Sequence, residues 1–319
     1  MTVRPPAPSP DLRVVAPATS ANLGPGFDSL ALALDYWNTI DIRLGGSDCP
    51  RIMEIEGEGA DTLERDARNL VLLAMHRLAE EANRRLPPCE IGLKNKIPLG
   101  RGLGSSAAAI VGGLVAAAAL LHLDGTPQAL LPIALSLEDH PDNVAAALYG
   151  GFTVGVLENG TPRVLCLRPS EDLRAVVLVP EMFAGTLESR QTLPALISRS
   201  DAVFNGGRCA LLALALCERR WDLLAVAMED RLHQPQRAQI FTYLDEAISA
   251  ARTAGAHGAA LSGSGSSVLA LCTGSEEAVA SAMTEAAARL GLAAHALILS
   301  MAPEGAHKVR TLSAEGARV

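Results

Sequence analysis

Apolar and polar residues recur with two different periods along the first half of the chain. Short alternating runs predict four β-strands, at residues 12–19, 36–44, 51–56 and 89–97. Apolar residues spaced three and four positions apart, or in one long run, predict helices over residues 69–84, 105–122 and 127–137. Residues 20–28 are polar and contain Gly and Pro, which predicts a turn. The pattern therefore predicts a mixed α/β unit.

The second half continues with the same mixture. It predicts paired strands at 152–157 and 163–167, a buried strand at 173–179, and helices over 193–218, 221–229 and 241–253. The last part predicts strands at 259–261, 267–272 and 295–300 around a helix at 276–290, an order that resembles a split β-α-β unit. We predict a loose tail over residues 1–11, a first domain over 12–165 and a second domain over 166–319.

Composition excludes several classes of partner. The 319 residues are 49% hydrophobic and 19% charged, which is typical of a globular protein. The net charge of −8 and the 3% aromatic content argue against a nucleic-acid partner. The uncharged run 105–123 approaches the length of a membrane span, but its Ala and Gly residues favour a helix buried against a sheet. We expect no membrane partner.

The six cysteines give no sign of a disulfide framework or a metal site. They form no C-x-x-C pair, and the histidines are not spaced around them as ligands would be. Reduced, mostly buried thiols are typical of a cytoplasmic protein, which is the location that we predict.

The segment 97–109, with the sequence IPLGRGLGSSAAA, is the strongest candidate for chemistry. Its glycines at alternate positions allow the backbone to approach a bulky anion, and the unpaired N–H groups of the helix that follows suit a polyphosphate. The two serines can bond phosphate or Mg²⁺. The segment lacks the Gly-Lys-Ser/Thr ending of the P-loop and the G-x-G-x-x-G spacing of dinucleotide-binding proteins. A tight strand-to-helix turn without a ligand remains the alternative.

Three motifs, in order, resemble those of the GHMP small-molecule kinases. They are APATSANLGPGFD at 16–28, the loop at 97–109 and SGSG at 262–265. Within this superfamily the segments 21–28, 138–144 (EDHPDNV) and 230–237 (DRLHQPQR) resemble the homoserine kinases. The resemblance spans nearly the whole chain.

The resemblance implies a two-domain α+β fold. The first domain is expected to resemble ribosomal protein S5 domain 2, with a left-handed β-α-β unit, and the second to be a ferredoxin-like α/β sandwich. The implied reaction is transfer of the γ-phosphoryl group of ATP to the side-chain hydroxyl of L-homoserine, on the path to threonine. Mg²⁺ is the implied metal, and the assembly is expected to be a homodimer. The alternatives are a kinase for a sugar or an isoprenoid alcohol, or a silent protein of the same fold.

The resemblance also implies residues for the nucleotide and the metal. Ser106 and Glu138 are the expected Mg²⁺ ligands; the less favoured alternative for Glu138 is a solvated carboxylate at a helix end. Lys96 either approaches phosphate or lies in solvent. The expected ATP-binding residues are Asn69, Leu70, Lys96, Pro98, Leu99, Gly100, Arg101, Gly102, Leu103, Gly104, Ser105, Ser106, Ser262, Gly263, Ser264 and Gly265.

Homoserine is a zwitterion, so its site requires an anion and a cation. By the resemblance, Asp28 binds the ammonium group, and Arg190 and Arg237 bind the carboxylate, unless these arginines form surface salt bridges. Asn22 and Asn143 are expected to orient the attacking hydroxyl. The expected acceptor-binding residues are thus Asn22, Asp28, His140, Asn143, Thr186, Arg190 and Arg237, with Asn22, Asp28 and Asn143 as the catalytic group. No general base is expected, because an amide stands at position 143 and Asp142 is predicted to be structural.

Overall fold

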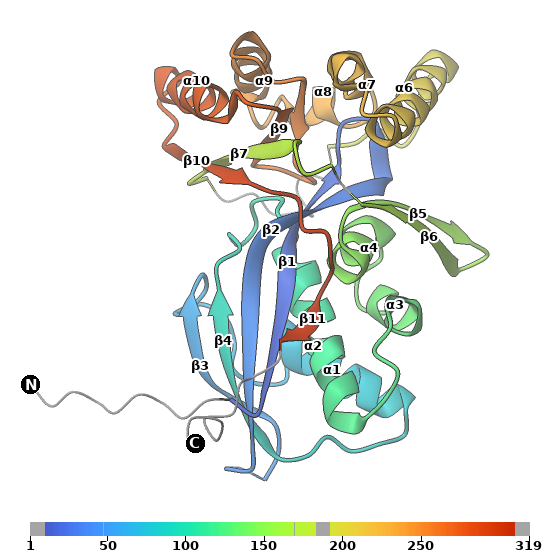
Figure 1. The fold of residues 1–319 in the computed structure, drawn as a ribbon, viewed down its shortest axis with the longest axis vertical. Helices are drawn as coiled ribbons and strands as arrows, with labels where there is room; N and C mark the ends of the chain where they lie inside the picture. The colour runs from blue at the N-terminus through green and yellow to red at the C-terminus, as the bar shows by residue number, and fades with distance from the viewer. Residues whose placement is uncertain (1–9, 47, 169, 183–191, 310–319) are drawn as a thin grey trace, which may run out of the picture.

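The computed structural model describes residues 10–46, 48–168, 170–182 and 192–309. It consists of two β-sheets, each with helices on one face (Figure 1). The strands of the first sheet are β1 (Leu12–Asn22), β2 (Gly26–Leu44), β3 (Arg51–Gly57), β4 (Cys89–Asn95), β5 (Phe152–Glu158), β6 (Thr161–Leu167) and β11 (His307–Val309). Its helices are α1 (Leu70–Glu81), α2 (Ser105–Leu121), α3 (Pro127–Leu135) and α4 (Pro141–Tyr149).

The first sheet has the order β11-β1-β2-β4-β3, and β5 pairs with both β2 and β6. Strands β3 and β4 pair in parallel and are joined through α1, which gives the β-α-β unit. Helix α2 lies at the centre of the core, with 12 of its 17 residues buried. The uncharged run is therefore a buried helix, as predicted. None of the helices in the described ranges is long and apolar enough to span a bilayer.

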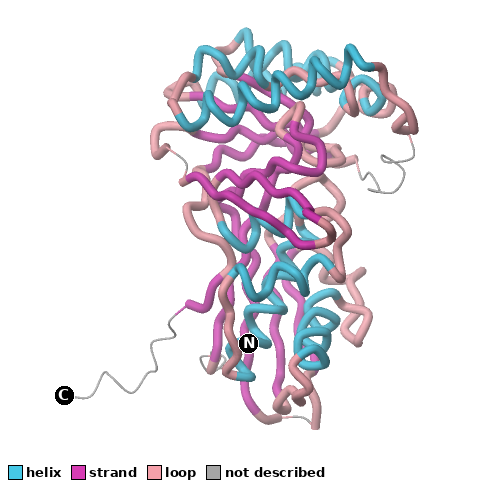
Figure 2. The backbone as a smooth tube through the Cα atoms, turned by 90° about the vertical axis from the view of Figure 1, so that its right-hand side faces the viewer, coloured by secondary structure: helices cyan, strands magenta, loops and turns pink. Residues whose placement is uncertain are grey.

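The second sheet has the order β10-β7-β9-β8, and all of its pairs are antiparallel. Strand β7 lies between β9 and β10, which are connected through α10, so the predicted split β-α-β order is confirmed. Figure 2 shows the helices of this half as a layer on the side of the sheet that faces away from the first domain. The elements are β7 (Arg174–Pro180), α6 (Arg199–Cys217), a 3₁₀ turn (Trp221–Leu223), α7 (Leu224–Ala227), α8 (Gln234–Arg237), α9 (Leu244–Thr253), β8 (Gly258–Leu261), β9 (Val268–Cys272), α10 (Glu276–Arg289) and β10 (Ala294–Leu299).

The two halves share a hydrophobic core. One cluster of buried side chains joins Leu30 and Phe152 of the first sheet to Leu212, Leu269 and Met301 of the second half. The predicted boundary between residues 165 and 166 falls near the end of β6, just before the connection to β7. The chain then returns to the first sheet, because β11 pairs with β1.

Three local features differ from the prediction. The turn predicted at residues 20–28 is present but shorter, at residues 23–25: β1 continues to Asn22 and β2 begins at Gly26, because the polar side chains here are buried at the contact between the halves rather than solvated. The helix predicted from residue 193 begins at Arg199, since Ser198 accepts a hydrogen bond from the Asp201 N–H and caps it. Helix α4 was not predicted; Pro141 occupies its first turn, a position where Pro is favourable.

Candidate active site

The glycine loop connects β4 to α2 and leaves the first turn of α2 uncapped. Gly104 is the N-cap residue, with φ of 67°, and provides no side chain to bond the N–H groups that follow. A Cβ atom at Gly102 would lie 2.1 Å from the Ser262 carbonyl oxygen, and one at Gly104 would lie 1.8 Å from Thr19 Oγ1. Glycine is required at both positions because β1 and a loop of the second half approach so closely. The uncapped N–H groups at the start of α2 have the geometry that suits a phosphate group.

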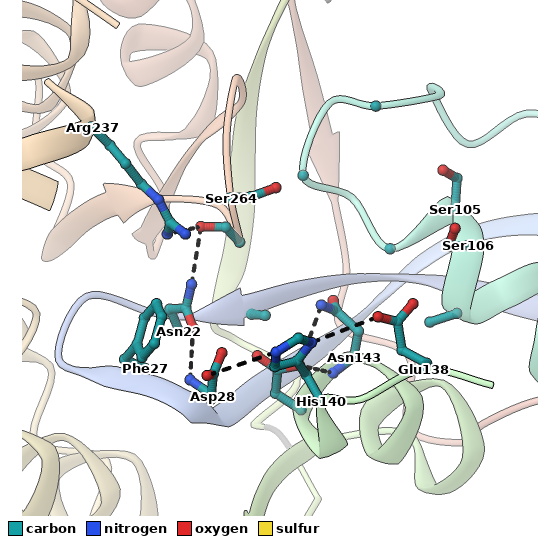
Figure 3. A pocket seen from close by; sticks show the side chains of 17 residues that line it. Asn22, Phe27, Asp28, Ser105, Ser106, Glu138, His140, Asn143, Arg237 and Ser264 are labelled. Carbon is teal, nitrogen blue, oxygen red and sulfur yellow. Dashed lines mark hydrogen bonds and ion pairs between the residues drawn. The ribbon is translucent and has the colours of Figure 1, made fainter. Parts of the chain in front are cut away.

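A cavity of about 290 Å³ lies beside this loop, between the two halves of the molecule (Figure 3). It brings together most of the predicted acceptor-binding residues with the phosphate loop. Thr186 and Arg190 lie outside the described residues. The cavity, hereafter the acceptor cavity, is lined by Ala21, Asn22, Phe27, Asp28, Gly100, Gly102, Gly104, Ser105, Ser106, Ala107, Glu138, His140, Asp142, Asn143, Arg237, Gly263 and Ser264.

Acidic groups flank a histidine on one wall of the acceptor cavity. His140 Nε2 lies 4.0 Å from Asp28 Oδ2, and His140 Nδ1 lies 3.7 Å from Glu138 Oε1. All three side chains are about 30% exposed, so water and a bound cation can reach them. The two carboxylates give this wall a negative potential, which suits an ammonium group or a metal ion.

Asp142 and Asn143, at the start of α4, form the floor of the cavity. The pKa of Asp142 is raised to about 6, mainly by burial and also by the nearby carboxylates of Asp28 and Glu138, against the opposing effects of its hydrogen bond to Asn143 and of His140. Asp142 Oδ1 accepts the backbone N–H of Asn143 at 2.6 Å. The Asn143 amide oxygen in turn lies 2.7 Å from the Thr19 hydroxyl, within hydrogen-bond distance. The floor is thus held by bonds from two different elements.

Arg237 lies on the opposite wall and is almost completely buried. Its Nη1 donates to the Gly263 carbonyl and to His233 Nδ1, each at 3.0 Å. Burial lowers the pKa of His233 to about 4, so this ring is neutral and its Nε2–H donates to the Gly24 carbonyl. Asn22 Nδ2 donates to the same Gly263 carbonyl, at 3.0 Å. Hydrogen bonds thus hold the guanidinium of Arg237 in place.

The loop between β8 and β9 closes the cavity from the second half. Ser262 Oγ lies 2.7 Å from the Gly102 carbonyl oxygen and 2.8 Å from Ser20 Oγ, so this hydroxyl joins the two halves. Gly263 and Ser264 line the cavity, whereas Ser262 is buried behind it and Gly265 packs closely against Phe241. Two of the four predicted residues of this loop therefore line the cavity, and the other two pack behind them.

A second cavity, of about 420 Å³, meets the first at the phosphate loop. Gly100, Ser105 and Ser106 line both. Among the predicted nucleotide residues, Asn69, Leu70 and Leu99 also line it. This nucleotide cavity is completed by residues that were not predicted: Asn38, Thr62, Leu63, Glu64, Arg68, Val71, Leu93, Asn95 and Ala109.

Six of the predicted ATP-binding residues line neither cavity: Ser262 and Gly265, described above, and four others. Leu103 belongs to the hydrophobic core, and Pro98 is also buried. Arg101 Nε donates to the Pro180 carbonyl and Nη2 to that of Glu181, so its side chain joins the loop to the second half. The Lys96 side chain is exposed, and its backbone N–H donates to Asn38 Oδ1.

Within the described ranges, no cluster of three or more His, Cys, Asp or Glu residues is arranged to hold a metal ion. Ser106 and Glu138 nevertheless both line the acceptor cavity, and each presents an oxygen donor. This donor set fits Mg²⁺, which takes one or two protein oxygens and completes its shell with water and phosphate oxygens.

Comparison with known proteins agrees with the fold and the motifs. The chain matches the family "GHMP kinases N terminal domain" over residues 69–151 and "GHMP kinases C terminal" over 212–289. It is 42% identical over 305 residues to a homoserine kinase of Carboxydothermus hydrogenoformans (95% of this chain, 98% of the relative). It is 48% identical over 318 residues to a homoserine kinase of Symbiobacterium thermophilum (96% of each chain).

Solved structures agree. A homoserine kinase from Cytophaga hutchinsonii superposes with a TM-score of 0.86 at 32% identity, covering 97% of this chain and 100% of that one. A mevalonate kinase superposes with a TM-score of 0.67 at 16% identity, which shows the shared fold alone. With the glycine loop, the split second sheet and the motifs of both domains in place, the chain belongs to the homoserine kinase family of the GHMP kinases.

Proposed function

We propose that the protein transfers the γ-phosphoryl group of ATP to the side-chain hydroxyl of L-homoserine, giving ADP and O-phospho-L-homoserine, a step toward threonine. The observation that supports this most is the acceptor cavity. It places an acidic wall, a buried arginine and the phosphate loop around one space of about 290 Å³. A small zwitterion with a hydroxyl group suits that arrangement of charge.

Asp28 holds the ammonium group of homoserine and Arg237 its carboxylate, because they provide opposite charges on opposite walls. The predicted partners Thr186 and Arg190 belong to the same proposal, on the strength of the family resemblance. The guanidinium of Arg237 is fixed by Gly263 and His233, so little side-chain entropy is lost when a carboxylate binds.

ATP lies across both cavities, with its phosphates at the uncapped start of α2 and its base in the nucleotide cavity. Ser106 and Glu138 hold Mg²⁺, which when bound neutralises charge on the transferred phosphoryl group. Gly100, Gly102 and Gly104 let the backbone approach the phosphates, as in other glycine-rich phosphate sites.

The chain supplies positioning rather than a strong base for the transfer. Asn143 cannot accept the hydroxyl proton as a carboxylate would. The oxygen of homoserine therefore attacks before it is fully deprotonated, and its proton leaves late, to a phosphate oxygen or water. A loose, metaphosphate-like transition state permits this order. Asn22 and Asn143 orient the hydroxyl.

A coupled assay of ADP release tests this function directly. The acceptors are L-homoserine, L-serine, L-threonine, mevalonate and galactose, each with and without Mg²⁺. We expect magnesium-dependent release that is fastest with L-homoserine. Faster turnover of mevalonate or galactose would favour another small-molecule kinase, and no release with any acceptor would favour a silent protein of this fold.

We also propose a cytoplasmic homodimer. All six cysteines are free thiols, in keeping with a reducing compartment. Leu196, Val203 and Leu214, on and just before α6, expose 88%, 70% and 62% of their surface, which leaves apolar area for a second copy to cover. Light scattering should give twice the mass of the 33.2 kDa chain; a monomer would refute the dimer.

A further inference from the structure

Thr19 is a completely buried polar residue that lies directly beneath the phosphate loop. Its backbone N–H donates to the Leu103 carbonyl at 3.1 Å, and its hydroxyl lies 2.7 Å from Asn143 Oδ1. It therefore joins β1 to the phosphate loop through its backbone and to α4 through its side chain. Thr19 lines neither cavity, so its hydroxyl reaches the reaction only through Asn143.

The neighbours of Asn143 decide which way its amide faces. Asp142 Oδ1 accepts the Asn143 backbone N–H at 2.6 Å and lies 3.4 Å from Asn143 Nδ2. Because Asp142 Oδ1 already acts as an acceptor for the backbone N–H, the NH₂ group of the amide, which is a donor, belongs on the Asp142 side. The amide oxygen then faces Thr19, whose hydroxyl must donate to it.

We propose that Thr19 is a positioning residue for phosphoryl transfer that acts through Asn143. This inference rests on the proposed function. By occupying the amide oxygen, Thr19 holds the Asn143 side chain, which rises from the start of α4 into the cavity (Figure 3), and leaves its NH₂ group as the part offered to the substrate. Asn143 then donates a hydrogen bond to the attacking hydroxyl oxygen or to a phosphoryl oxygen and takes no proton.

Gly104 makes this contact possible. A Cβ atom at position 104 would lie 1.8 Å from Thr19 Oγ1 and 3.2 Å from Asn143 Oδ1. The hydroxyl and the amide thus occupy the space that a side chain on the loop would fill. The hydrogen bond between Thr19 and Asn143 fixes the distance between the phosphate loop and the amide that orients the acceptor. Loss of this hydrogen bond should therefore lower kcat more than it changes substrate binding.

The test compares Thr19→Val with Thr153→Val. Thr153 is also completely buried, in β5 of the same sheet, and its hydroxyl donates to the Ala31 carbonyl, away from both cavities. The variants lose one hydroxyl each at nearly constant shape. We expect Thr19→Val to lower kcat about 10- to 100-fold, with the KM values for ATP and L-homoserine changed less than threefold. Thr153→Val should leave kcat within twofold, and Thr19→Ser should retain most of it.

A double-mutant cycle with Asn143→Ala identifies the route of the effect. In the Asn143→Ala enzyme, adding Thr19→Val should lower kcat no further, because the residue through which Thr19 acts is gone. If Thr19→Val does not fold, Thr19→Ala and Thr19→Ser replace it as a pair that differs by the hydroxyl alone. An unchanged kcat, or an equal loss with and without Asn143, would overturn the role of Thr19. A wild-type enzyme inactive on L-homoserine would refute the proposed function itself.

Discussion

The two cavities that meet at the phosphate loop are built differently. The acceptor cavity takes its lining from both halves of the molecule and contains Asp28, Glu138, His140, Asp142 and Arg237. The nucleotide cavity is larger and takes its lining from the first half alone. Six of its lining residues have apolar side chains: Leu63, Leu70, Val71, Leu93, Leu99 and Ala109.

This difference separates two kinds of recognition. Under the proposed function, opposed charges held across the contact between the halves select a small zwitterion, and this selection depends on the halves staying together. The second cavity, which lies within one half and combines apolar with polar side chains, would bind a flat base by burial and depend less on the second half. Variants in one cavity should therefore leave the KM of the other substrate nearly unchanged, except at the loop that both share.

The largest expected effect is at that shared loop. Gly104→Ala places a Cβ atom 1.8 Å from Thr19 Oγ1 at a φ of 67°. We expect kcat/KM to fall about 1,000-fold for both substrates, because displaced groups cost about 100-fold per ångström and a left-handed Ala costs about 1–2 kcal/mol more. Gly160→Ala is the control: it has a φ of 79° but open space around it. Equal activity of the two variants would show that the close contact is unimportant.

The second prediction concerns the buried acid of the acceptor cavity. The folded pKa of Asp142 is about 6, above its ordinary value of 3.8, so the fold binds the proton more tightly than the unfolded chain does. The stability that this contributes is complete below about pH 4 and is lost as the pH rises through 6. Asp28, Glu138 and His140 are the titratable groups that face it.

Asp142→Asn removes this titration. The gain in unfolding free energy over the wild type should therefore grow from pH 4 to pH 7, by up to about 3 kcal/mol. Urea unfolding at a series of pH values measures it, with Asp139→Asn, at an exposed neighbouring position, as the control. A pH-independent difference would contradict the raised pKa.

The third prediction tests the charged wall. Asp28→Asn should lower kcat/KM for L-homoserine about 100-fold, equivalent to about 3 kcal/mol, by removing the partner of its ammonium group. The KM for ATP should change little. Asn tolerates the φ of 55° at this position, so the backbone is preserved. Asp35→Asn, an exposed change in the same strand, should have no effect. An equal change in kcat/KM for both substrates would show that Asp28 does not bind the acceptor.

The smallest effect is expected in the nucleotide cavity. Ala109→Leu adds volume to its wall and should raise the KM for ATP about tenfold, or about 1.4 kcal/mol, while the KM for L-homoserine stays constant. Ala119→Leu, near the end of the same helix and away from the cavity, is the matched control. An increased KM for L-homoserine alone would mean that the two cavities have been assigned the wrong way round.

The same contrast explains what the sequence could predict. The phosphate loop and five further site residues belong to continuous sequence motifs and could be predicted: Asn22, Asp28, His140, Asn143 and Arg237. The structure brings them together in one cavity. The nucleotide cavity draws on single residues of separate elements, such as Asn38 of β2 and Leu93 of β4, which have no local signal because their pairing is set by the sheet.

Burial also changes the structural role of polar residues from the one that the sequence predicts. Ser20 and Asn22 predict a turn by composition, yet they lie in β1 and bond to the second half. In the sequence, Thr19 looks like an ordinary strand residue. Its hydroxyl has a role only because Gly104 and Asn143, which are distant in the chain, lie next to it. Contacts between distant segments decide such roles, and a pattern of neighbours along the chain does not contain them.

A crystal structure with a non-hydrolysable ATP analogue, Mg²⁺ and L-homoserine tests the central claim most directly. The account predicts the base in the nucleotide cavity, the phosphates at the start of α2, and homoserine between Asp28 and Arg237 with its hydroxyl oxygen facing the terminal phosphate. Homoserine bound outside the acceptor cavity, or with its hydroxyl directed away from the phosphate loop, would contradict it.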